Sequence, residues 1–362
     1  MKMENLENKQ NSLVNKIEGK DPETILNIVK KELDDLEKQL VANKIDEAEK
    51  NFDSLVDTFP RIADTIKDSG KVKEIIKKIL SLWEKGKQVP GKILNAMKKF
   101  GENVKNINDQ ETVKIVVKEA AATIGANVVP NVVAGGFMAG VANSLGSIAN
   151  KLDEETVNNF VNKVADDKSD DYPWVEIVNN LEKNPGLVDK VNSVAVNNLA
   201  KKAINSKEMK LGLIKAFKNE ELVKKMSSEE FDLIIDGEVD NVNSLGYIAE
   251  AINNIVGKME NWNVINSLFV DKFPKKLDVI KKKNLLKKLD GKTINKLNKV
   301  QPKSLEVFLG KIIDEWNPEI LDAIKNDNKD LLKFIKENKS LVSLYKKKVE
   351  ANDPDNLLDA WK

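Results

Sequence analysis

Apolar residues recur at steps of three and four along most of the chain, the spacing that places them on one face of an α-helix. Residues 21–56 show the pattern most clearly, with Asp21 in position to cap a helix and Pro22 at its first position. One apolar stripe follows, made of Ile25, Ile28, Val29, Leu33, Leu36 and Leu40. Asp, Glu and Lys occupy the opposite face, so the pattern predicts an amphipathic helix over this stretch.

The same periodicity predicts helices over 71–85, up to about 100 after an interruption at 88–91, and from Asp153 onward. Beyond Trp174 the pattern predicts short helices that are interrupted by Pro, Gly, Asn or Ser. This punctuation is typical of a helical array or an irregular bundle, although the segments do not align as a known helical repeat. Alternation typical of strands is almost absent. We therefore expect an all-α protein, an irregular multi-helix bundle or array.

One stretch departs from this pattern, because the thirty-one positions from Ala120 to Asn150 contain no Lys, Arg, Asp or Glu. Pro130 lacks an amide hydrogen and crowds the preceding turn, so two helices are expected, over about 112–128 and 132–149. Together they predict a central hydrophobic hairpin rich in small residues, which permit close approach of another helix. The residues expected to pack on a helix or a membrane are Val133, Gly136, Phe137, Gly140, Val141, Ser144 and Leu145.

Three environments are consistent with this hairpin: a buried core, a buried segment that enters a membrane on demand, or a permanent membrane hairpin. Its second arm of eighteen residues spans about 27 Å, close to the thickness of a bilayer core. Several Asn and Ser residues make it marginal as a permanent span. A charge-free, Ala/Gly/Val-rich hairpin flanked by amphipathic helices resembles the layout of α-helical pore-forming toxins such as the pore-forming colicins. That resemblance, which covers residues 111–150, implies an inserting role for the hairpin.

Two stretches are strongly basic. Residues 71–99 contain nine lysines and two glutamates, and a helix there would present Lys77, Lys78 and Trp83 to a membrane interface. An ordinary helix with its apolar stripe in a core has the same pattern. Residues 271–303 contain twelve lysines and three aspartates, which permits non-specific contact with nucleic acid or anionic lipid. Because arginines and interleaved aromatics are missing there, a solvated face or a contact with the acidic 153–189 region is favoured.

Composition restricts the chemistry available to the chain. It has no Cys and no His, which excludes disulfides, thiol nucleophiles, Ser–His–Asp chemistry and the usual zinc ligands. Arg61 is its one arginine, so sites that need a bidentate guanidinium are disfavoured. Neither a Gly-rich phosphate loop nor an EF-hand spacing is present. We expect no enzyme activity, no cofactor, no bound metal and no small-molecule substrate.

The expected divisions are a flexible tail at 1–20, amphipathic helices at 21–110, the hairpin at 111–150, an acidic connecting segment at 151–173 and a helical array at 174–362. The polar start lacks the apolar core of a signal peptide, which favours a cytoplasmic or particle-associated location. We expect a non-enzymatic structural or interaction protein with protein partners or self-assembly, of the kind found as a virion or phage component that is delivered to a membrane. The alternative is a membrane-perturbing or pore-forming toxin that inserts the 120–150 hairpin.

Overall fold

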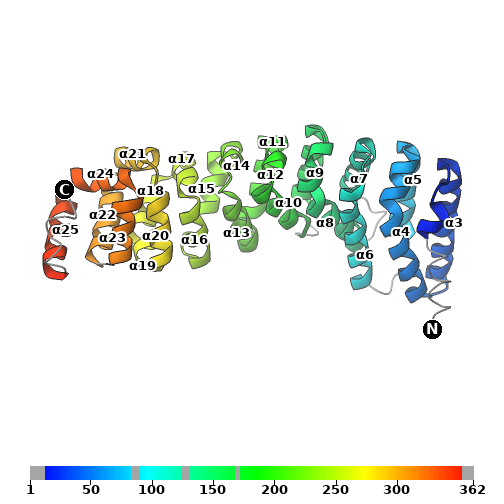
Figure 1. The fold of residues 1–362 in the computed structure, drawn as a ribbon, viewed down its shortest axis with the longest axis horizontal. Coiled ribbons are helices and arrows are strands. Elements are labelled where there is room, and N and C mark those ends of the chain that lie inside the picture. Colours follow the sequence, from blue (N-terminus) through cyan, green and yellow to red (C-terminus); the bar gives the residue numbers. More distant parts are fainter. Residues whose placement is uncertain (1–12, 83–89, 124–130, 168–171, 316, 353–362) are drawn as a thin grey trace. The chain divides into compact units, whose positions relative to one another are not determined.

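The computed structural model describes residues 13–82, 90–123, 131–167, 172–315 and 317–352. Every regular element in these residues is helical, which confirms the all-α class. The chain divides into two compact units, Met1–Leu199 and Ala200–Lys362, and both consist of helices that follow one another as an array (Figure 1).

The first unit begins with four helices, α2 (Leu13–Ile17), α3 (Pro22–Val41), α4 (Ile45–Ile66) and α5 (Ser69–Leu82). Asp21 caps α3 as predicted, since its carboxylate accepts the backbone N–H of Thr24 at 3.0 Å. The single helix expected over 21–56 is wrong: the chain leaves the helix after Val41, and Asn43 has a positive φ of 56°. Asparagine tolerates this left-handed conformation, which ends a helix. Residues 13–17, expected within a flexible tail, form α2 with Leu13 and Ile17 buried.

The remainder of the first unit repeats a pattern of helix, short helical turn and helix. Its elements are α6 (Pro90–Glu102), η1 (Asn103–Asn106), α7 (Gln110–Ala122), α8 (Asn131–Ile148), η2 (Ala149–Lys151), α9 (Glu154–Asp166), α10 (Tyr172–Lys183), α11 (Pro185–Lys190) and α12 (Ser193–Ile204), whose last residues belong to the second unit. The arms of the expected hairpin are α7 and α8. Helix α7 ends at Ala122, earlier than predicted, and Pro130 lies outside the described residues. Helix α8 packs mainly on α6 and α10, so its closest neighbour is not the other arm.

The second unit consists of four modules, each built from three successive helical segments. They are α13 (Lys207–Ala216), α14 (Glu220–Lys225) and α15 (Ser228–Asp236); α16 (Val242–Glu250), α17 (Ile252–Lys258), α18 (Trp262–Ser267), η3 (Leu268–Lys272) and α19 (Phe273–Lys276); α20 (Val279–Lys288), α21 (Gly291–Val300) and α22 (Pro302–Asp314); and α23 (Pro318–Asp327), α24 (Lys329–Glu337) and α25 (Lys339–Asn352). In the second module the third segment is the continuous run of α18, η3 and α19.

Equivalent helices of successive modules pack on one another in rows. The first helices form the row α13, α16, α20 and α23, and the short second helices form the row α14, α17, α21 and α24. Figure 1 shows α14, α17 and α21 along one edge of the unit. The first helices start at Lys207, Val242, Val279 and Pro318, a spacing of 35 to 39 residues. The second unit is therefore a repeat array, a regularity that the sequence pattern does not reveal.

Asparagine side chains join the modules through the ends of their helices. The last carbonyl groups of a helix have no partner within it, and burying them unpaired is costly. The Asn254 amide in α17 donates to the carbonyl of Phe217, directly after α13, at 2.9 Å. The Asn328 amide, at the start of α24, donates to the carbonyls of Leu286 and Leu289 at 2.6 and 2.7 Å. We call these contacts the asparagine clasps, and they fix one module on the next.

Candidate functional site

Helix α8 lies in the core of the first unit. Phe137, Val141 and Leu145 have no exposed surface, and Gly136, Gly140 and Ser144 are also buried. The side chain of Val133 is not among those described. No helix of the described ranges combines the length and the apolar character needed to cross a membrane.

Gly140, one of the small residues of α8 expected to permit a close helix partner, lies against α6. A Cβ atom added to Gly140 would lie 2.0 Å from the carbonyl oxygen of Lys98, and one added to Gly101 would lie 2.3 Å from the carbonyl oxygen of Phe137. The two backbones are therefore in direct contact at this crossing, which only residues without a side chain allow. Beside the crossing, the rings of Phe100 and Phe137 stack with their centroids 5.1 Å apart.

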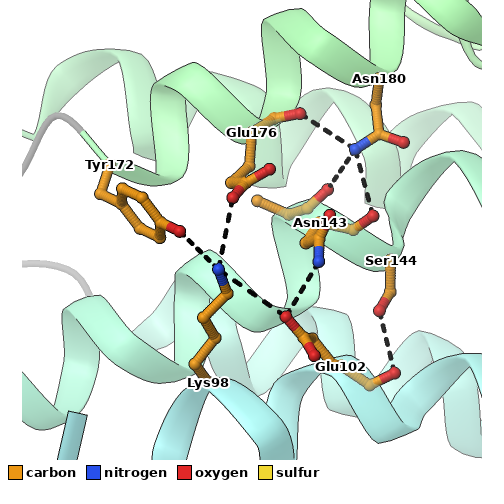
Figure 2. A network of polar contacts seen from close by, with 8 residues as sticks. Lys98, Glu102, Asn143, Ser144, Tyr172, Glu176 and Asn180 are labelled. Atoms are coloured by element: carbon orange, nitrogen blue, oxygen red, sulfur yellow. Dashed lines mark hydrogen bonds and ion pairs between the residues drawn. The ribbon is translucent and has the colours of Figure 1, made fainter. Parts of the chain in front are cut away.

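A polar network ties α8 to both of its neighbours (Figure 2). It consists of Lys98 and Glu102 of α6, Asn143 and Ser144 of α8, and Tyr172, Glu176 and Asn180 of α10. The Ser144 hydroxyl donates to the Glu102 carbonyl at 3.0 Å, and the Asn143 amide donates to the Glu102 carboxylate at 2.9 Å. The Asn180 amide donates to the carbonyls of Ala142 and Asn143 at 3.0 and 3.2 Å. The network satisfies backbone groups along α8.

Lys98 is the cation of this network. Its ammonium donates to the Tyr172 hydroxyl and lies 3.5 Å from Glu176 and 3.8 Å from Glu102. The Tyr172 hydroxyl, followed by the carboxylates, raises the pKa of Lys98, so the amine stays protonated. The network therefore joins α6, α8 and α10 through hydrogen bonds and ion pairs.

The basic segment before α8 also turns its apolar side inward. Val72, Ile75, Ile76 and Ile79 of α5 are buried, while Lys77 is exposed. Lys78 donates to Glu37 of α3 at 2.5 Å. Trp83, expected at a membrane interface, lies outside the described residues.

Several lysines of the basic stretch 271–303 pair with carboxylates elsewhere in the second unit. The pairs are Lys272 and Lys276 with Asp240, Lys282 with Glu315, Lys283 with Glu319, and Lys287 with Asp327. Lys282 is nearly buried, and both oxygens of Glu315 accept its hydrogen bonds, at 3.0 and 2.7 Å. These pairs lie on the first-helix row and at the module junctions, and they neutralise most of the charge there.

A second group of lysines lies at a different place, on the row of second helices. A cleft of about 350 Å³ lies between α14, α17 and α21, and we call it the second-helix cleft. Its lining includes Lys224, Lys258, Lys292 and Lys296, against the carboxylates of Glu220 and Asp290. Three successive modules contribute to it, so it depends on the stacking of the array.

The two carboxylates of the cleft are already engaged. Glu220 pairs with Lys224 at 3.0 Å, and Asp290 caps α21 by accepting the Thr293 N–H at 2.7 Å. Lys258 and Lys292, by contrast, have no carboxylate within ion-pair distance among the residues that the structure describes. The second-helix cleft therefore carries uncompensated positive charge.

Lys296 is the most constrained of these cations. Its ammonium donates to the Gly257 carbonyl at 2.8 Å and lies 5.3 Å from the centre of the Trp262 ring. Burial lowers the pKa of Lys296, and repulsion from Lys292 lowers it further, while the Glu260 carboxylate partly offsets this effect. Two like charges are thus held close together in a partly desolvated place, an arrangement that an anion would stabilise.

No chemistry beyond charge is evident in the described ranges. They contain no group of three Asp or Glu side chains arranged to hold a metal ion. The chain matches no protein-family model, and no curated protein matches it in sequence. The second-helix cleft was not predicted: Lys258 lies outside the basic stretches, and Lys292 and Lys296 were expected on a solvated face. The capping residues Asn219, Asp290 and Asn328, which start equivalent helices, are the signal that would align the modules.

Proposed function

We propose that the chain is a non-enzymatic interaction scaffold, in which stacked helical modules present binding surfaces to protein partners. The observation that carries this proposal is the modular construction of the second unit, where helix rows from four modules face solvent side by side. Stacked repeats of this kind bury a continuous core and leave extended surfaces that recruit other proteins. A binding role also agrees with the polar network around Lys98, in which the lysine already pairs with groups of the chain itself.

Co-purification from the source organism followed by light scattering tests the scaffold proposal. We expect a complex of defined stoichiometry whose mass exceeds that of the chain. Asn328→Ala, which opens the clasp at α24, should reduce the yield of complex, while Lys303→Gln on the surface of α22 should leave it unchanged. A monomer without a stoichiometric partner would contradict the proposal. Association with a viral particle stays a prediction, which mass spectrometry of purified particles tests.

The burial of α8 supports a packing role for the uncharged segment over the inserting role of a toxin. Insertion would require α8 to leave α6 and α10, breaking the contacts of Gly140, Ser144 and Asn143 described above. Release of a dye from anionic liposomes is the test. We expect none from the wild-type protein; release that is abolished by Gly136→Lys or Val133→Asp would favour the toxin function.

A further inference from the structure

We propose that the second-helix cleft binds an acidic segment of a protein partner, whose carboxylates pair with Lys258, Lys292 and Lys296. This inference rests on the proposed function and names the chemistry of the partner. The three lysines line one cleft and come from α17 and α21, which pack on each other. Lys296 donates to the carbonyl of Gly257, the residue before Lys258. Elsewhere in the second unit, Lys272, Lys282 and Lys287 have carboxylate partners from the chain itself.

The shape of the site favours an extended ligand. The cleft crosses three helices of three modules, so a single small ion would occupy only part of its 350 Å³. Gly257 lines the cleft, and nothing lies within 4 Å of the place where its side chain would begin. A backbone can therefore approach α17 closely there, while its side chains reach the lysines on either side.

The chemistry of the site favours carboxylates over nucleic acid. Lysine acts as a point charge and lacks the planar fork with which arginine grips a phosphate. Single-stranded nucleic acid also needs aromatic faces on which its bases stack. The Trp262 ring beside the cleft is covered by the Lys296 ammonium, so that face is occupied.

Fluorescence anisotropy with labelled hexaglutamate tests the assignment on the full-length protein. We expect saturable binding that weakens about tenfold in the variant Lys258→Gln/Lys292→Gln, since each exposed ion pair contributes modestly. The matched control, Lys299→Gln/Lys303→Gln, removes the same charge from exposed positions that do not line the cleft, and should change the affinity less than twofold. Labelled hexaglutamine should not bind. Circular dichroism checks that each variant is folded.

Three outcomes would overturn the assignment: no binding of hexaglutamate, equal loss in both double variants, or tighter binding of a labelled single-stranded oligonucleotide or of inorganic phosphate at the same lysines. If the co-purified complex exists but survives Lys258→Gln/Lys292→Gln unchanged, the cleft assignment fails and the scaffold function stands. If no complex exists, the scaffold function fails whatever hexaglutamate does.

Discussion

The contact between α6 and α8 predicts that Gly140→Ala destabilises the first unit, although alanine is the better helix former. The new Cβ atom would lie 2.0 Å from the Lys98 carbonyl, whereas ordinary contacts begin near 3.4 Å. All its nearest atoms are backbone, so no side-chain rotation relieves the clash, and the helices must separate by about 1.4 Å.

The cost of this separation can be estimated from its consequences. Inserting atoms into a packed core costs about 1–3 kcal/mol, and the hydrogen bond from Ser144 to α6 contributes about 1 kcal/mol more. Alanine recovers about 1 kcal/mol through its helix propensity. We expect the free energy of unfolding to fall by about 1–3 kcal/mol.

Gly310→Ala in α22 is the matched control. There the added atom would lie 3.8 Å from a Leu341 methyl group, an ordinary contact. That variant should gain about 0.5–1 kcal/mol, because only the propensity changes.

Urea denaturation followed by circular dichroism measures both changes. Hydrogen exchange with mass spectrometry localises the first one to peptides of α6 and α8. An unchanged or higher urea midpoint for Gly140→Ala would refute the reasoning, because the crossing would then accommodate a side chain.

Three further predictions concern polar contacts. Asp153, which caps α9, has its pKa lowered to about 2 by hydrogen bonds from Thr156, so its carboxylate stabilises the fold above about pH 4, and this contribution is lost as the pH falls toward 2. Because the side chain is half exposed, Asp153→Ala should cost about 1 kcal/mol at pH 7 and clearly less at pH 2, where about half of the native carboxylates are protonated, in urea titrations at both pH values. Asn328→Ala should cost about 2–4 kcal/mol in the same assay, since it leaves buried carbonyls unpaired; a loss below about 1 kcal/mol would show that water replaces the clasp. Glu315→Gln should cost about 1–2 kcal/mol by leaving the Lys282 ammonium buried without its counter-ion, whereas Lys282→Met should stay within about 1 kcal/mol of wild type; equal losses would contradict this.

The local features of the fold were predictable from the sequence, because they depend on residues a few positions apart. The apolar stripes gave the all-α class, and the caps at Asp21 and Asp153 gave two helix starts. The break near Asn43 was missed because the apolar period continues through it, and only the backbone conformation ends the helix.

The repeat and the second-helix cleft were not predictable in this way. Module lengths vary, and the asparagine clasps join residues 37 to 42 positions apart, for which no local pattern exists. In the sequence, the lysines of the cleft cannot be distinguished from ordinary solvent-exposed lysines. They become a site only because α17 and α21 stack, which brings Lys296 to the Gly257 carbonyl. The small residues of α8, in contrast, predicted a closely packed partner helix, but they did not identify α6 as that helix.

The asparagine clasps have a consequence for how the second unit responds to pulling. Because Asn328 seals the end of α20, melting the 318–352 module leaves the Leu286 and Leu289 carbonyls of its neighbour bare. At this junction, and at the one closed by Asn254, the later module thus covers carbonyl groups of the earlier one, so loss of the later module weakens its neighbour. Under force the array should peel from its C-terminal side in steps of one module, with each step releasing the chain length of 35 to 39 residues.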